Sequence, residues 1–235
     1  MGSKRRIAKH LVLVIKAHRK ANQVYVEPFA GGMNMMEHFR GKRIANDLNH
    51  YVIACFKALQ KGWIPPEFVS EDDYKDIKNN KDKHDDFLVG YVGVNSFGCK
   101  WFGGYRRDFK GQEHAPDSWR HHKASSLNQS QKLKNVKFTS CSYENLEIPK
   151  NSVIYCDPPY KGTTGYLSKI NHANFWQWVR DRVAEGHTVF VSEYEAPEDF
   201  KTIWCRSLRN ELSESKAKEC LFVHESQAVI KTTLF

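Results

Sequence analysis

Apolar residues near the start of the chain recur at the spacing of one helical face. They are Ile7, Leu11, Val14 and Ile15. This spacing predicts a helix over residues 7–20. An uninterrupted apolar run at 24–26 follows and predicts a buried strand, which Pro28 and the glycine pair 31–32 would end. A second helix is expected to restart over 33–39.

Another strand and helix follow this first unit. The segment 43–46 predicts a strand that ends at Asp47, and the segment after it has the apolar spacing of a helix. The apolar face of that helix consists of Val52, Ile53, Phe56 and Leu59. Strands that alternate with helices favour a parallel sheet with helices on both faces, so we expect an α/β fold.

The residues from 61 to 135 have a different texture. They pass two adjacent prolines and a charged stretch over 71–86, and then reach a segment rich in glycine, aromatic residues and arginine over 96–107. We interpret 61–135 as a small, mostly helical insertion. The remainder, 1–60 and 136–235, is expected to form one core, because a chain of 235 residues suffices for a single good-sized core.

The second half of the chain returns to short apolar runs. Strands are predicted at 136–139, 153–156, 188–191, 202–204, 220–223 and 228–233. Between the second and third of these, Phe175, Val179 and Val183 lie four residues apart and predict a helix. These strands would complete the sheet that begins in the first half.

The chain carries 36 Lys and Arg against 27 Asp and Glu, which gives a formal net charge of +9. This excess favours a polyanionic partner, because Lys and Arg that neutralise phosphates release condensed counterions. A merely basic soluble protein is the alternative. No apolar run is long enough to span a bilayer, and the N-terminus lacks the pattern of a targeting signal. We therefore expect a soluble protein with no membrane partner.

The six cysteines lie far apart and form no C-x-x-C pair. A chain of this size does not need a disulfide framework, so the pattern favours a reducing cytoplasm. His114, His121, His122 and Cys99 do not have the spacing of zinc ligands, and we expect no metal site.

Two predicted strands end in residues suited to a ligand. The first is followed by Glu27-Pro28-Phe29-Ala30-Gly31-Gly32. In an open parallel sheet, ligands bind beyond the carboxyl ends of the strands, where glycines admit a ligand close to the backbone and a following helix offers free N–H groups. An ordinary turn is the alternative. Asp47, at the end of the next strand, can accept bonds from ribose hydroxyls or cap the helix that follows.

The second of these ends, Asp157-Pro158-Pro159-Tyr160, is more specific. Consecutive prolines stop the strand and hold the backbone rigid, so a carboxylate and a prolyl carbonyl can be aimed at one point. The exocyclic amine of adenine is a poor nucleophile, because its lone pair is delocalised into the ring. Two acceptors bonded to its hydrogens would localise that lone pair for in-line attack on a methyl sulfonium. Tyr160 would stack on the purine, and a plain rigid turn is the alternative.

These motifs resemble those of the Dam-type, alpha-group family of N6-adenine DNA methyltransferases, in the small form found in bacteria and phages. The segments E-P-F-A-G-G and D-P-P-Y are similar to the family's cofactor and catalytic motifs, and Gly2-Ser3-Lys4 is similar to its glycine-lysine start. The resemblance extends over nearly the whole chain. It implies a class I S-adenosylmethionine-dependent methyltransferase fold with a Rossmann-like sheet, in which the insertion is the target-recognition domain.

The resemblance also implies roles for individual residues. Cofactor contacts fall on Lys4, Glu27, Pro28, Phe29, Ala30, Gly31, Gly32, Asp47, Ser142, Tyr143 and Asp157, catalysis on Asp157, Pro158, Pro159 and Tyr160, and DNA contacts on Lys100, Trp101, Tyr105, Arg106, Arg107 and Arg120. The family usually has Asp where this chain has Ser142, so we expect one cofactor contact to be weaker. The implied reaction is direct transfer of a methyl group from S-adenosylmethionine to a flipped adenine.

Other functions share this geometry. Enzymes that methylate cytosine N4, adenine in RNA or protein glutamine also present a planar amine, and an inactive DNA-binding relative would keep the fold. The expected partner is double-stranded DNA, with a restriction endonuclease as a possible counterpart. We expect a monomer or weak dimer in the cytoplasm of a bacterial or phage-infected host.

Overall fold

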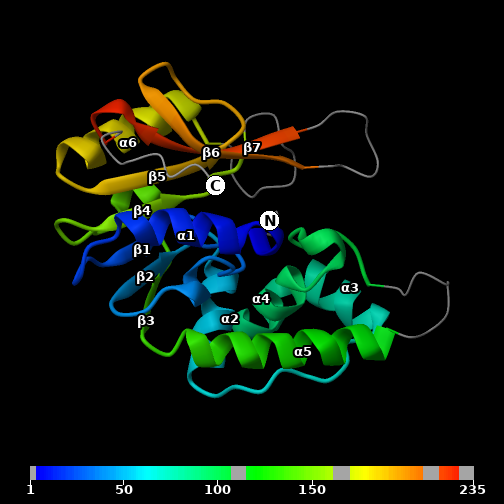
Figure 1. The fold of residues 1–235 in the computed structure, drawn as a ribbon. Coiled ribbons are helices and arrows are strands. Elements are labelled where there is room, and N and C mark those ends of the chain that lie inside the picture. The colour runs from blue at the N-terminus through cyan, green and yellow to red at the C-terminus, as the bar shows by residue number, and fades with distance from the viewer. Residues whose placement is uncertain (1–3, 107–114, 161–169, 209–216, 228–235) are drawn as a thin grey trace.

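The computed structural model describes residues 4–106, 115–160, 170–208 and 217–227. These residues form a seven-stranded sheet flanked by helices (Figure 1). The strands are β1 (Tyr25–Glu27), β2 (Arg43–Asn46), β3 (Val136–Thr139), β4 (Val153–Cys156), β5 (Thr188–Glu193), β6 (Phe200–Leu208) and β7 (Ala217–His224). The α-helices are α1 (Ala8–His18), α2 (His50–Gln60), α3 (Glu71–Asn79), α4 (Asp86–Val94), α5 (Ala115–Lys132) and α6 (His172–Ala184).

Short 3-10 turns connect these elements. They are η1 (Lys4–Arg6), η2 (Met36–His38), η3 (Lys81–Lys83), η4 (Phe97–Cys99), η5 (Tyr143–Asn145) and η6 (Glu225–Gln227). No helix in the described part of the chain is long and apolar enough to cross a membrane.

The strand order across the sheet is β3-β2-β1-β4-β5-β7-β6. The neighbours from β3 to β5 pair in parallel, and β7 runs antiparallel to both β5 and β6. The order reverses between β1 and β4, which are adjacent although more than a hundred residues separate them in the chain. A parallel sheet of this kind binds ligands beyond the carboxyl ends of the strands at that point of reversal.

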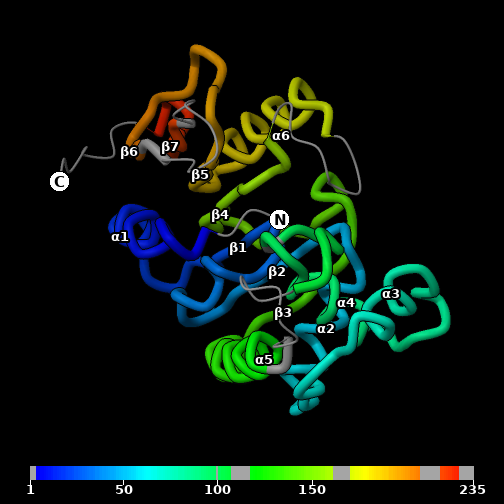
Figure 2. Tube along the Cα trace, turned by 90° about the vertical axis from the view of Figure 1, so that its right-hand side faces the viewer, coloured from blue at the N-terminus to red at the C-terminus, as the bar shows by residue number. Residues whose placement is uncertain are grey.

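Two apolar clusters hold the helices on the sheet. One contains residues of α1 together with Tyr25 and Tyr155, and the other contains residues of α6 together with Val26 and Ile154. Because successive residues of a strand point to opposite faces, the two clusters lie on opposite faces of the sheet. Figure 2 shows α1 and α6 on the two sides of the strands.

The segment between β2 and β3 is mostly helical, as predicted. Its helices α3, α4 and α5 gather beside α2, and α4 approaches α2 closely at Gly90, where an added Cβ would lie 1.9 Å from the carbonyl oxygen of Tyr51. Val89 and Trp119 from these helices belong to the same apolar cluster as α1. The helical segment is therefore packed onto the sheet domain through a continuous core.

The prediction of a helix over 33–39 is wrong. The structure has successive turns and only the short η2, because Met33 adopts a φ of +59°, outside the right-handed helical region. Met33, Met35, Met36 and Phe39 are nevertheless all buried, so the turns serve the core as the predicted helix would have done. The predicted strand at 228–233 lies outside the described residues.

The cysteines also differ from expectation at one point. Cys205 in β6 and Cys220 in β7 form a disulfide across the antiparallel pair. The bond is a single cross-strand link and does not make a disulfide framework. The sequence spacing gave no sign of it, because the two residues become neighbours only when β6 and β7 pair in this register.

Candidate active site

A cavity of about 420 Å³ lies at the carboxyl ends of β1 and β4. Both motifs singled out in the sequence contribute to its wall. The expected site residues that line it are Lys4, Glu27, Pro28, Phe29, Ala30, Gly31, Gly32, Asp47, Ser142, Tyr143, Asp157 and Pro159. The cavity is of a size that suits a small-molecule ligand.

Glu27 ends β1 and is only 2% exposed. Its Oε1 has no hydrogen-bond partner among the described residues, although it is shielded from water. Burial, reinforced by the nearby carboxylate of Asp157 and only partly opposed by the neighbouring hydroxyl of Tyr25, raises the pKa of Glu27 well above its usual value. A buried carboxyl with a free acceptor, lining a cavity, is suited to a cationic ligand.

The glycine turn after Glu27 is tied to Asp47. The backbone N–H of Gly31, at a φ of +47°, donates to Asp47 Oδ2 at 2.9 Å, and the N–H of Asn49 donates to Asp47 Oδ1 at 2.9 Å. Asn49, not Asp47, caps α2 by accepting from the N–H of Tyr51. The expectation that a helix N-terminus offers free N–H groups here is wrong, because no α-helix follows the turn and the Gly31 N–H is occupied.

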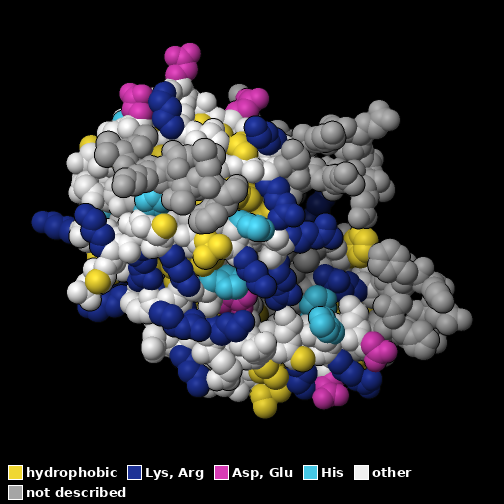
Figure 3. All heavy atoms as spheres, in the orientation of Figure 1, with side chains coloured by type: hydrophobic (Ala, Val, Ile, Leu, Met, Phe, Trp, Pro, Cys, Tyr) yellow, Lys and Arg dark blue, Asp and Glu magenta, His cyan; other side chains and the backbone are white. Residues whose placement is uncertain are grey.

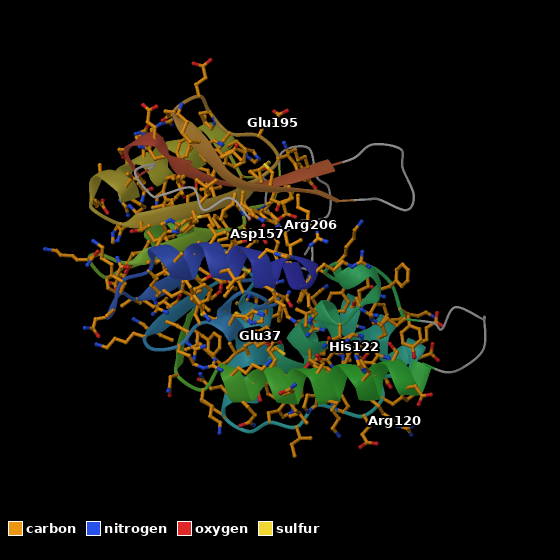
Figure 4. The ribbon with its side chains drawn as sticks, in the orientation of Figure 1. Glu37, Arg120, His122, Asp157, Glu195 and Arg206 are labelled. Carbon is orange, nitrogen blue, oxygen red and sulfur yellow. A yellow bond between two sulfur atoms is a disulfide. The ribbon has the colours of Figure 1, made fainter. Side chains whose placement is uncertain are left out.

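Asp157 follows β4 directly, and the buried Pro158 comes next. The Asp157 side chain is 22% exposed, and its Oδ1 lies 3.0 Å from the ammonium of Lys4. Burial raises the pKa of Asp157, and the ammonium of Lys4 opposes that rise. Figure 4 shows Asp157 at the centre of the molecule, between β4 and the N-terminal end of α1. Its carboxylate can therefore act as a fixed acceptor at the cavity wall.

Lys4 is 8% exposed and lies against the catalytic motif. Besides Asp157, its ammonium contacts the hydroxyl of Tyr160 and the carboxylate of Glu219 in β7. Burial alone would lower the pKa of Lys4, but the carboxylates of Asp157 and Glu219 raise it above its usual value. The resemblance placed this lysine at the cofactor. The structure places it on the cavity wall with its charge bound to Asp157.

Tyr160 does not line the cavity. Its hydroxyl donates to Glu219 Oε1 at 3.1 Å, and its ring meets that of Tyr194 edge to face, with the centroids 4.5 Å apart. Neither Glu219 nor Tyr194 was expected at the site. The sequence offered one indication of Glu219: a glutamate directly before the apolar run of β7, where a charged side chain is rarely buried unless it has a partner.

Ser142 follows β3 and directly precedes η5, and Tyr143 is the first residue of η5. The Ser142 hydroxyl donates to Glu144 Oε2 at 3.1 Å, so a carboxylate two residues further on also lines the cavity. The ring of Tyr143 packs on that of Phe29 with the centroids 5.2 Å apart. Burial and the carboxylate of Glu144 raise the pKa of Tyr143 to about 12.

Trp101, expected to contact DNA, lines the same cavity. Its ring fills the space above Gly93 of α4, where an added Cβ would lie 2.3 Å from a ring carbon. The helical segment therefore contributes part of the wall of the cavity at the carboxyl ends of β1 and β4.

The other expected DNA contacts are distributed unevenly. Tyr105 donates from its hydroxyl to the carbonyl of Val69, and Arg106 donates from Nε to the carbonyl of Asn95, so both are partly engaged inside the helical segment. Lys100 is exposed.

Arg120 is exposed and pairs with Asp117 at 3.2 Å, and Figure 4 places it on the outer side of α5, away from Asp157. Arg107 lies outside the described residues.

Comparison with known proteins gives one family. The model of the D12 class N6 adenine-specific DNA methyltransferases matches residues 1–95 and 102–204. No curated protein matches the chain. Among solved structures, the chain is similar to that of SMU.472, described as a candidate methyltransferase complexed with SAH, with 14% identity and a TM-score of 0.39. The alignment covers 94% of this chain and 52% of that one, so the chain spans about half the length of the matched protein.

Proposed function

The chain belongs to the D12 class N6 adenine-specific DNA methyltransferase family, and on this premise we propose that it transfers a methyl group from S-adenosylmethionine to the exocyclic amine of adenine in double-stranded DNA. The observation that carries the proposal is the meeting of two strand ends at one cavity. Glu27 and the glycine turn end β1, and Asp157 with its prolines follows β4, the adjacent strand.

The residues of the cavity fit S-adenosylmethionine, which carries a sulfonium and an ammonium. Four carboxylates line the wall, those of Glu27, Asp47, Glu144 and Asp157, and Lys4 is already bound to one of them. The unpartnered, buried Oε1 of Glu27 is the strongest indication, because a buried acceptor without a donor is costly unless a ligand supplies one. Asp47 is placed to accept from ribose hydroxyls, and Tyr143 and Phe29 offer aromatic surface for the adenine of the cofactor.

When bound, the cofactor supplies an electrophilic methyl group on sulfur. The carboxylate of Asp157 and the carbonyl of Pro158 would each accept one hydrogen of the target amine, which localises the nitrogen lone pair. Holding the nitrogen in line with the methyl group would lower the barrier, because the reacting atoms are already oriented. The N–C bond would form as the C–S bond breaks, with the demethylated sulfide as the leaving group, and the proton lost by the nitrogen would pass to the carboxylate of Asp157 or to solvent.

An adenine inside a duplex cannot reach Asp157, so we propose that it is rotated out of the stack, at a cost of a few kcal/mol. Tyr160 is the proposed stacking partner; its hydroxyl is held by Glu219, and because its ring does not line the cavity, the ring would have to turn toward the base. Stacking on an aromatic ring contributes about 1–3 kcal/mol per base and offsets much of that cost.

Arginine and lysine side chains on this face are placed to hold the DNA phosphates. Arg206 of β6 lies on one side of Asp157, and His122 of α5 lies on the side of the helical segment (Figure 4). Burial lowers the pKa of His122 to about 4, and the charges of Arg106, His121 and Arg5 add to the shift. His122 is therefore uncharged near neutral pH and marks the cationic groups around it without itself pairing with a phosphate. Figure 3 shows further Lys and Arg side chains gathered over α1 on this face. We propose that the duplex crosses the cavity between β6 and α5.

We further propose that residues 61–135 form the target-recognition region, with Lys100, Arg106 and Arg107 as leading contacts. A monomer or weak dimer in the cytoplasm, with a restriction endonuclease as a possible counterpart, completes the proposal.

The test is a nucleoside digest of DNA treated with the purified protein and S-adenosylmethionine. We expect N6-methyladenine in the treated DNA and none with Asp157→Ala. N4-methylcytosine, or label in RNA or protein but not in DNA, would replace adenine in DNA as the substrate. Binding of DNA and cofactor with no methylated product at all would indicate an inactive relative and overturn the proposal.

A further inference from the structure

Glu219 is a buried carboxylate at the active site, although it comes from the far end of the chain. It lies in β7 and is 4% exposed. Its Oε1 contacts the ammonium of Lys4 and accepts from the hydroxyl of Tyr160 at 3.1 Å. Glu219 is not among the residues lining the cavity, so it acts from behind the cavity wall, through its contacts with these two side chains and through its charge.

The position of Glu219 is fixed by the sheet. In the β6–β7 register Glu219 lies opposite Arg206, and the next pair is Cys205 with Cys220, which is closed by the disulfide. Directly opposed residues in an antiparallel pair share one face of the sheet. The position of the Glu219 carboxylate beside Lys4 is therefore fixed by the backbone pairing of β7.

The contacts of Lys4 use all of its donors. A lysine ammonium has three N–H groups and no acceptor. In this structure its contacts are one oxygen of Asp157, one oxygen of Glu219 and the hydroxyl of Tyr160. With its donors shared in this way, the ammonium cannot place a second bond on Asp157. The Lys4 ammonium thus contacts Asp157 through Oδ1, which makes the other oxygen, Oδ2, the candidate acceptor for the target amine.

We propose that Glu219 is a positioning residue that anchors the ammonium of Lys4, so that one oxygen of Asp157 remains available to the adenine amine. This inference rests on the proposed function for the role of Asp157. Without the Glu219 carboxylate, the ammonium would move onto Asp157 and compete with the substrate for the same lone pairs.

The charges around the pair give the inference a pH signature. The titratable groups around Asp157 come from several elements: Lys4 of η1, Glu27 of β1, Tyr155 of β4, Glu219 of β7, and Tyr160, which follows β4. Glu219 in turn lies opposite Arg206 of β6. The carboxylate of Glu219 raises the pKa of both Asp157 and Lys4. Removing its charge should therefore lower both, and both limbs of the rate–pH profile should move to lower pH.

The experiment compares Glu219→Gln with Glu219→Asp in the full-length protein, with Glu37→Gln as the matched control. Glu37 is also a buried glutamate with a lysine partner, Lys132 at 3.5 Å, but it is remote from Asp157 (Figure 4). We expect Glu219→Gln to lower kcat about 10- to 100-fold, the range for a misplaced reacting group, with the KM for S-adenosylmethionine within about twofold. Both limbs should shift down in pH. Glu219→Asp should keep the limbs of the wild type, and Glu37→Gln should keep both rate and limbs.

A loss of rate in Glu219→Gln with both limbs unmoved would show a purely structural role and overturn the inference, as would an unchanged kcat. A second readout does not depend on catalysis. NMR titration of the Lys4 side chain in the free protein should show a lower Lys4 pKa in Glu219→Gln, and an unchanged titration would refute the anchoring. If that shift is found but the wild type methylates no adenine, the proposed function fails and the anchoring of Lys4 stands.

Discussion

Replacing Glu27 with Gln should have opposite effects on cofactor binding and on the stability of the free protein. The substitution keeps the size of a side chain that is 2% exposed and removes its ability to ionise. A hydrogen bond between charged groups contributes about 1.5–3 kcal/mol, and each 1.4 kcal/mol is a factor of ten. If Glu27 binds a charged group of S-adenosylmethionine, Glu27→Gln should raise the Kd about 10- to 150-fold.

The pKa of Glu27 adds a second expectation. Burial raises it in the free protein, and a cationic ligand favours the ionised carboxylate, so binding should expel a proton. The wild-type Kd should fall as pH rises toward the raised pKa, more steeply than that of Glu27→Gln. Any titration of the ligand itself is common to both proteins, so the difference between the two isolates Glu27.

The same substitution should stabilise the free protein although it weakens cofactor binding. A carboxyl whose folded pKa lies above its unfolded value of about 4.5 stabilises the fold below that value, and the contribution is lost as pH rises through the folded pKa. Glutamine does not ionise, so the free variant should have a higher Tm than the wild type, by an amount that grows with pH. For a protein of this size each kcal/mol corresponds to about 2–4 °C.

Calorimetric titration with S-adenosylmethionine, in two buffers of different ionisation enthalpy, measures both the Kd and the proton release. Glu37→Gln is again the control, and it should leave the Kd unchanged. A Kd of Glu27→Gln within twofold of the wild type, or equal pH dependence in the two proteins, would refute the role of Glu27 in binding the cation. A lower Tm of the free Glu27→Gln variant would refute the claim that ionisation of the buried Glu27 destabilises the free protein.

Three other variants test separate parts of the structure. Gly93→Ala should push the ring of Trp101 into the cavity, at a typical overpacking cost of about 1–3 kcal/mol, and should weaken cofactor binding; unchanged Tm and Kd would place the ring elsewhere. Tyr160→Ala should weaken binding to duplexes with a mismatched adenine more than it weakens cofactor binding, and equal affinities before and after the change would count against stacking. Replacing Cys205 and Cys220 by Ser should lower the free energy of unfolding in urea by about 3 kcal/mol, from a separation of 15 residues, whereas an unchanged midpoint would show that the disulfide does not form in solution.

Local patterns in the sequence were enough to predict most of the sheet. The strands at 43–46, 136–139 and 153–156 were found at their observed bounds. The last is a continuous apolar run, as expected for a strand buried on both faces, and the strand at 136–139 alternates apolar and polar residues. The prediction of a helix over 33–39 failed. Four of its seven residues are apolar, and the pattern does not show that Met33 adopts a left-handed conformation that breaks a helix.

The site was predictable only where its residues follow one another in the chain. Glu27, the glycines and Asp157 were found because each lies directly after a buried strand. Glu219 was missed because its contact with Lys4 spans most of the chain and depends on the β7 register.

Trp101 was assigned to DNA from its basic, aromatic neighbours. Only the packing of its ring over Gly93 places it at the cavity.

The most direct test of the account is single-turnover transfer of a tritiated methyl group to an adenine-containing duplex by two variants of Asp157. Asp157→Ala should abolish transfer while still binding S-adenosylmethionine. Asp157→Asn should retain a trace, because an amide oxygen still accepts one hydrogen bond. Transfer by the alanine variant at the wild-type rate would contradict the claim that this carboxylate holds the target amine.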